Sequence, residues 1–97
     1  MNNERIEFTI LRNLIFNEDY TRKVLPFVNE IFFTKREEQI LFQEINSFVM
    51  KYKNLPSKES ILIELGNRKD INEEENRIVK ELINTLNPEE IDQQWLL

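Results

Sequence analysis

Three groups of glutamates are the residues in this sequence whose type and spacing could do chemistry: residues 37–38, 73–75 and 89–90. Neighbouring carboxylates can bind a metal ion or act as a general acid and base. Each group, however, falls in the first turn of a helix predicted below, where the helix dipole stabilises negative charge by ~0.3 to 1 kcal/mol without any ligand. We therefore interpret these glutamates as helix-start residues and predict neither a metal site nor a catalytic site.

Nucleophilic and nucleotide chemistry lack the residues that they need. Ser47, Ser57 and Ser60 have no histidine to activate them, and no cysteine is present as a nucleophile or a zinc ligand. A phosphate-binding loop needs several glycines so that the backbone can approach the anion, whereas Gly66 is the only glycine. We predict that this chain binds no cofactor and is not an enzyme by itself.

The composition indicates one small helical domain, residues 1–97. The sequence is 40% hydrophobic, with one Gly and three Pro to interrupt helices. It contains no apolar run of about 18 residues and does not begin like a signal peptide, so we predict a cytoplasmic protein without a membrane span. The net charge of −5 has the wrong sign for a domain that binds nucleic acid mainly by neutralising phosphates, and it favours a protein partner.

Hydrophobic spacing and capping residues predict the first two helices. Residues 4–16 carry apolar side chains at helical spacing, namely Ile6, Ile10, Leu11, Leu14 and Ile15, with Phe8 beside them. Asn17 is the predicted N-cap of a second helix through residue 25, with Glu18 and Asp19 in its first turn. Pro26 ends this helix, because a proline inside a helix removes a backbone hydrogen bond.

The longest helix is predicted over residues 35–53. Thr34 and Glu37 match a capping box at its start. Its predicted core face consists of Leu41, Ile45, Phe48, Val49 and Tyr52, with Ile40 and Phe42 at its flanks. We expect Phe48 to lie in the middle of the core.

Three further helices complete the prediction. Ser57 is the predicted N-cap of a short helix that ends at Gly66 in a left-handed C-cap. Asn72 and Glu75 predict a capping box before a fifth helix, whose apolar stripe consists of Ile78, Val79, Leu82, Ile83 and Leu86. An Asn-Pro pair at residues 87–88 begins a sixth helix without a stop signal. Because no strand-like alternation appears, we predict an all-α orthogonal bundle of about six helices.

A helix-turn-helix DNA-binding regulator is an alternative. The stretch SFVMKYKNLPSKESILIELG, residues 47–66, reads as helix, turn and helix. A recognition helix presents polar and basic side chains to the major groove, whereas this one offers Lys58 followed by Glu59 and Glu64. Lys51, Lys53, Lys58, Arg68 and Lys69 could form a basic patch or a solvated rim. We favour the rim.

Aromatic side chains give the remaining signal. Phe32, Phe33 and Trp95 exceed what a small core needs, and exposed aromatic residues often mark protein interfaces. We expect Phe33 to plug one end of the bundle. The candidate interface residues are Phe32, Trp95, Leu96 and Leu97.

The succession of these segments resembles the N-terminal domain of DnaB-like replicative DNA helicases, particularly the version found in T-even-type bacteriophages. The stretches that carry the resemblance are ILRNLIFNEDYTRKVLPFV at 10–28, IFF at 31–33, ILFQEINSF at 40–48, NLPSKESILIEL at 54–65 and LINTLNPEEIDQQWL at 82–96. They cover nearly the whole chain in the family's order. Each stretch alone is a helical core pattern, so the specificity of the resemblance lies in their order and spacing.

The resemblance implies a helical head in the collar above a hexameric motor, where heads form a trimer of dimers and contact DNA primase. ATP and Mg²⁺ would be bound only by a separate C-terminal RecA-like motor domain, which also contacts DNA. We interpret the uncapped end at residues 92–97, DQQWLL, as a helix that continues into the family's helical hairpin. A free-standing phage adaptor that mimics the head is a second alternative.

Overall fold

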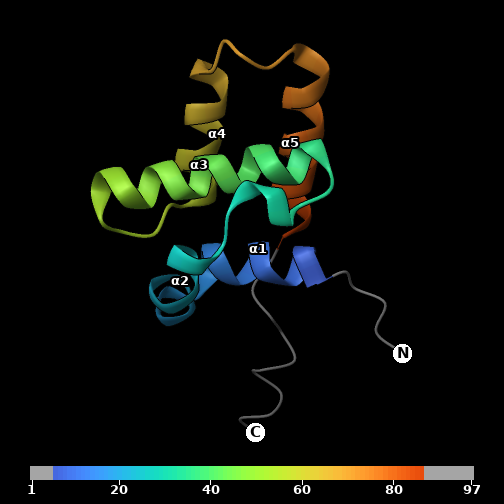
Figure 1. Cartoon of the computed structure of the whole chain (residues 1–97). Coiled ribbons are helices and arrows are strands. Elements are labelled where there is room, and N and C mark those ends of the chain that lie inside the picture. The colour runs from blue at the N-terminus through green and yellow to red at the C-terminus, as the bar shows by residue number, and fades with distance from the viewer. Residues whose placement is uncertain (1–5, 87–97) are drawn as a thin grey trace, which may run out of the picture.

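The computed structural model describes residues 6–86, which contain five α-helices, two 3-10 turns and no strand (Figure 1). The elements are α1 (Ile6–Phe16), α2 (Glu18–Val24), η1 (Leu25–Phe27), η2 (Glu30–Phe32), α3 (Arg36–Tyr52), α4 (Lys58–Asn67) and α5 (Glu73–Thr85). The predicted all-α class is confirmed. The sixth predicted helix, from residue 87, lies outside the described residues. Within residues 6–86, no helix has both the length and the apolar character needed to cross a membrane.

Side-chain caps begin three of the helices where the sequence predicted them. Asn17 accepts a hydrogen bond from the Tyr20 backbone N–H at 3.1 Å, at the start of α2. At the start of α5, the Asn72 side chain accepts from the Glu75 N–H at 2.7 Å, and the Glu75 carboxylate accepts from the Asn72 N–H at 3.1 Å. Ser57 caps α4 in the same reciprocal way. Such caps each stabilise a helix by about 1 kcal/mol.

Two predicted caps are wrong. The N-cap of α3 is Lys35, whose side chain makes no capping hydrogen bond, so the predicted capping box from Thr34 does not form. Gly66 lies inside α4, which ends at Asn67, and the C-cap residue Arg68 has extended backbone. The left-handed residue is instead Lys53, with φ of 56°, where its N–H donates to the Val49 carbonyl at 2.8 Å and turns the chain out of α3. A lysine can adopt the left-handed conformation at a cost of about 1–2 kcal/mol. The path of the chain between α3 and α4, not the presence of a glycine, therefore decided which residue is left-handed.

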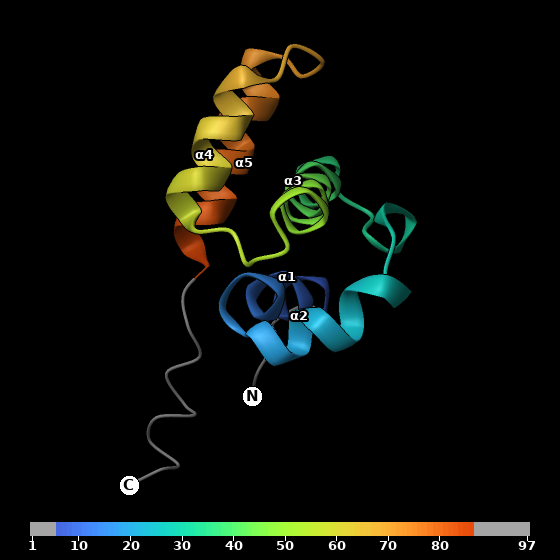
Figure 2. The same cartoon turned by 90° about the vertical axis from the view of Figure 1, so that its left-hand side faces the viewer.

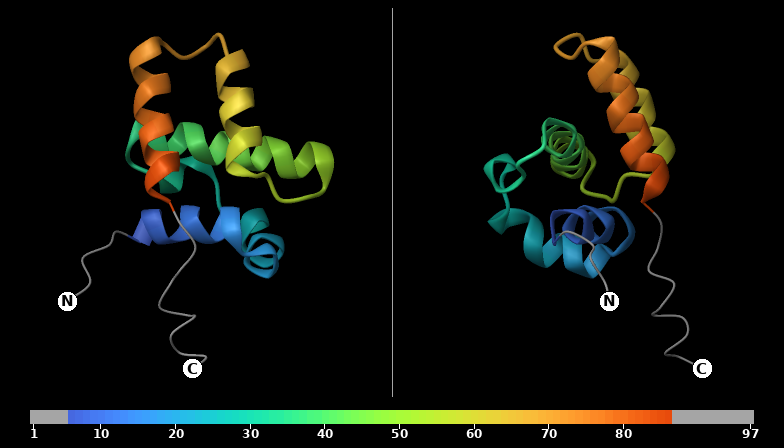
Figure 3. Two further views of the ribbon diagram at one scale, coloured as in Figure 1. Left: turned by 180° about the vertical axis from the view of Figure 1, so that it is seen from behind. Right: turned by 90° about the vertical axis from the view of Figure 1, so that its right-hand side faces the viewer.

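Helix α3 lies at the centre of the bundle. It contacts α1, α4, α5 and η2. Helices α4 and α5 form an antiparallel pair that crosses α3, and α1 packs with α2 on the other side (Figures 1 and 2). Two further views show η1 and η2 on the side of α3 away from α4 and α5 (Figure 3). The second half of α3 extends beyond its neighbours (Figure 1).

The core is built around the first half of α3. It consists of Leu11, Leu14, Ile15, Leu25, Phe33, Ile40, Leu41, Phe42, Ile45, Ile61, Leu65, Val79, Ile83 and Leu86. Within α3 the buried residues end at Ile45, so the prediction that placed Phe48 in the middle of the core is wrong: Phe48 is half-buried against Tyr52, which is 49% exposed. Ile6, the first residue of α1, is also 65% exposed.

The position of the core predicts which substitution in α3 destabilises the protein most. Ile45→Ala removes a side chain that is 0% exposed, so we expect it to lower the free energy of unfolding by about 2–5 kcal/mol. Phe48→Ala should lower the free energy of unfolding less than Ile45→Ala does, because truncating the half-buried Phe48 side chain leaves no fully enclosed cavity. Urea denaturation followed by circular dichroism measures both values. A larger loss for Phe48→Ala would contradict the described packing.

Candidate interaction surface

The described carboxylates serve helix ends and ion pairs. Glu75 caps α5, and Glu74 forms an ion pair with Arg77 one turn away. Glu38 is 2% exposed in the first turn of α3, whereas Glu37 beside it is partly exposed. Among residues 6–86, no three acidic, cysteine or histidine side chains are grouped so that they could hold a metal ion. The glutamates at 89–90 lie outside the described residues.

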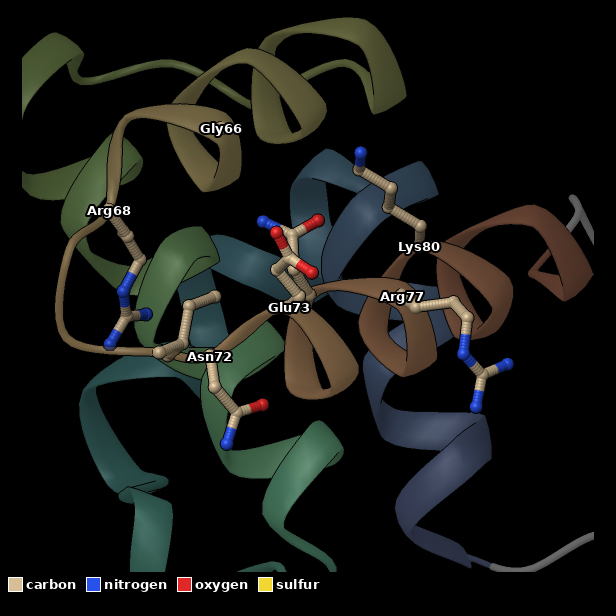
Figure 4. Close-up of a pocket in the computed structure, with 8 residues that line it drawn as sticks. Gly66, Arg68, Asn72, Glu73, Arg77 and Lys80 are labelled. Carbon is tan, nitrogen blue, oxygen red and sulfur yellow. The ribbon is translucent and has the colours of Figure 1, made fainter.

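A cavity of about 520 Å³ lies between the end of α4 and the first half of α5 (Figure 4). Its lining includes Arg68, Arg77 and Lys80. The guanidinium groups of Arg68 and Arg77 lie on opposite sides of the cavity and are both engaged in ion pairs with carboxylates of this chain (Figure 4). The two guanidinium groups therefore do not converge on one point in the cavity.

Arg68 connects the loop between α4 and α5 to the central helix. Its guanidinium donates to Glu44 at 2.9 Å and to Gln43 at 3.0 Å, both on α3. It also binds both carboxylate oxygens of Asp70, at 2.9 and 2.7 Å. Gln43 in turn donates to Glu30 of η2 at 2.8 Å. Five polar side chains therefore fix the loop, α3 and η2 relative to one another.

The two carboxylates bound by Arg68 respond to it differently. Burial, together with the nearby negative charges of Glu64 and Asp70, raises the pKa of Glu44 although the hydrogen bond and charge of Arg68 act in the opposite direction. Asp70 is exposed to solvent, so the hydrogen bond from Arg68 dominates and lowers the pKa of Asp70 from 3.8 to about 2. Asp70 is thus ionised across the neutral range and holds Arg68 in its bidentate geometry.

The pKa of Asp70 predicts an acid-dependent contribution to stability. Because its folded pKa lies below its unfolded pKa of 3.8, the interaction stabilises the folded state above that pH and is lost as the pH falls toward about 2. We expect Asp70→Asn to lower the free energy of unfolding at neutral pH and to have almost no effect near pH 2. Urea denaturation of both proteins across this range measures the difference. A difference that does not change with pH would contradict the prediction.

Two 3-10 turns expose an apolar surface. Phe27 of η1 is 86% exposed, and Ile31 and Phe32 of η2 are 82% and 45% exposed. We call these three residues the η1–η2 surface. Phe33, the next residue, is 0% exposed and contacts Phe42 with ring centroids 5.3 Å apart. The prediction that Phe33 plugs the bundle is confirmed, and the predicted interface residue Phe32 lies partly exposed beside it.

The sequence interpretation missed Phe27 and Ile31. Their signal was a pair of short apolar runs, LPFV and IFF, without helical periodicity. A three-residue turn has too few residues to bury every apolar side chain, so such runs leave some exposed. The other candidate interface residues, Trp95, Leu96 and Leu97, lie outside the described residues.

Three of the five basic residues of the helix-turn-helix alternative make contacts within the chain. Lys58 lies over the Phe16 ring at 5.8 Å, Lys51 lies over the Tyr52 ring at 5.2 Å, and Arg68 is held by carboxylates. The exposed face of α4 carries Ile63, which is 64% exposed, and Glu59. This face offers a DNA phosphate backbone little positive charge.

Comparison with known proteins relates the chain to a helicase. It is similar to a DnaB-like replicative helicase of Enterobacteria phage T4, with 33% identity over 88 residues that cover 91% of this chain. The chain spans 18% of the length of that helicase. No protein-family model matches the chain, and no solved structure matches it significantly. The chain is therefore similar to one segment of a replicative helicase, in agreement with the resemblance of its helical stretches.

Proposed function

We propose that the chain is the non-catalytic N-terminal head of a bacteriophage replicative hexameric helicase. The similarity to a DnaB-like replicative helicase carries this proposal, because it extends over 91% of the chain and only 18% of the helicase. A segment of that size leaves the larger part of the helicase for a motor domain, which would bind ATP and Mg²⁺ and contact DNA. The head would act in DNA replication through assembly of subunits into a collar and through contact with primase.

The described surface supports a role in protein contacts. Two strongly exposed apolar side chains, Phe27 and Ile31, and the partly exposed Phe32 form the η1–η2 surface, and exposed aromatic residues are enriched in protein interfaces. The net charge of −5 disfavours binding to DNA phosphates. The two features together favour an interaction module over a DNA-binding regulator, since that regulator would need a basic face.

The proposal predicts that the chain binds the primase encoded by the same genome. We expect a dissociation constant in the micromolar range, about −8 kcal/mol, by biolayer interferometry with the purified proteins. The double variant Phe27→Ser, Ile31→Ser should weaken primase binding about tenfold, because it removes two apolar side chains from the proposed interface. Both side chains are exposed, so the substitutions should not affect folding. Ile63→Ser is the matched control, since Ile63 is similarly exposed on α4, on the other side of α3.

Binding to duplex DNA distinguishes the helix-turn-helix regulator from the proposed function. If the chain binds duplex DNA at micromolar concentration with a steep dependence on salt, and primase does not bind, the helix-turn-helix regulator replaces the proposed function. If primase binds with equal affinity to the double variant and to the wild type, contact occurs elsewhere on the chain.

A further inference from the structure

A groove runs between α2–η1 and the second half of α3. It consists of two adjoining cavities of about 440 and 50 Å³, which share Thr21, Arg22 and Val49 in their linings. The larger cavity extends to Met50 on α3, and the smaller one extends to Lys53 at the end of that helix. The groove exists because α3 continues past the core while α2 and η1 lie beside it.

The wider part of the groove is mainly apolar. Leu25, Pro26 and Val28 line the side formed by η1, and Val49 and Met50 line the side formed by α3. Leu25 is 7% exposed at the floor, whereas Met50 is 62% exposed at the rim. Methionine is flexible and polarisable, and it is common at surfaces that accommodate apolar partners.

The polar groups of the groove suit an extended apolar partner better than a small polar molecule. The Thr21 hydroxyl already donates to the Leu14 carbonyl at 2.8 Å. Asn46 lies on α3 one turn before Val49 and Met50, and it is partly exposed. A small polar ligand needs several convergent polar groups to orient it. An amphipathic helix instead lays an apolar face, with residues at i, i+3, i+4 and i+7, into a hydrophobic groove, and the wider part of this groove has an apolar lining.

The charged residues at the rim indicate which charge a partner should carry. The lining contains two cations, Arg22 and Lys53, and one carboxylate, Glu18, which forms an ion pair with Arg22. Lys53 makes no ion pair within residues 6–86, so the lining carries one more positive charge than negative charge. In a chain of net charge −5, this groove is therefore locally positive and complements an acidic partner.

We infer that this groove binds an acidic amphipathic helix of another protein. The apolar face of that helix lies between η1 and α3, against Pro26, Val28 and Met50, and its carboxylates face Lys53 and Arg22. The inference rests on the groove and its charge, and it does not depend on the relation to a helicase.

A labelled model peptide tests the inference without knowledge of the natural partner. The probe is an amphipathic helix of roughly 18 residues, about 27 Å long, with leucines at i, i+3, i+4 and i+7 and with Glu and Ala elsewhere. A matched peptide replaces each Glu by Lys. We expect fluorescence anisotropy to show micromolar binding of the acidic peptide and at least about tenfold weaker binding of the basic peptide.

Substitutions at similarly exposed apolar residues locate the site. Met50→Glu should weaken binding of the acidic peptide about tenfold, because it places a carboxylate in the groove opposite those of the peptide. Ile63→Glu should change the affinity less than about twofold, since Ile63 is 64% exposed, close to the 62% of Met50, but lies outside the groove. Lys53→Asn introduces a residue type that readily adopts the left-handed conformation of Lys53. Because it removes a positive charge from the groove, it should reduce the salt dependence of peptide binding.

Three results would overturn the inference: no binding of the acidic peptide, equal binding of both peptides, or equal effects of Met50→Glu and Ile63→Glu. Circular dichroism checks that each variant remains folded. The peptide assay contains no primase, so its failure is distinct from failure of the proposed function. If primase binds the wild type and the Met50→Glu variant equally, the proposed function stands and the groove is not the primase site.

Discussion

The first half of α3 is buried on more than one face, and the rest of the structure depends on this enclosure. Five residues between 38 and 45 are buried, on more than one face of the helix: Glu38, Ile40, Leu41, Phe42 and Ile45. An ordinary surface helix buries one stripe, so a helix that is buried on more than one face requires neighbours in several directions. Helices α1, α4 and α5, together with η2, supply them.

This arrangement leaves the second half of α3 outside the core. Beyond Ile45 no residue of α3 is buried, and the apolar residues there become partly exposed surface. Helix α2 and η1 lie along this half and form the groove with Val49 and Met50. The enclosure that stabilises a small domain therefore also produces this apolar groove, because α3 extends past the core.

Polar contacts fix the parts that the apolar core does not reach. The loop between α4 and α5 contains few apolar side chains, and Arg68 anchors it to Glu44 and Gln43 of α3. Gln43 extends the contact to η2 through Glu30. Arg68 and Glu44 are mostly shielded from solvent, with side chains 16% and 11% exposed, whereas Asp70 is 64% exposed. Exposed ion pairs usually stabilise little, but a bidentate arginine in a connected network defines geometry better than isolated pairs do. The position of η2, and with it the exposure of Ile31, thus depends partly on this network.

The sequence by itself determined the helical class, most helix boundaries and most of the core, because these depend on local spacing and on caps such as Asn17 and Asn72. Phe33 was also correctly assigned to the core, and Phe32 to the surface. Only the tertiary structure decided which part of α3 is enclosed, so Phe48 was misplaced. It also decided that Lys53, not Gly66, takes the left-handed conformation. Periodicity shows which face of a helix is apolar but not how far neighbouring elements extend along it. The groove and the η1–η2 surface arise where apolar residues lie beyond the elements that would cover them.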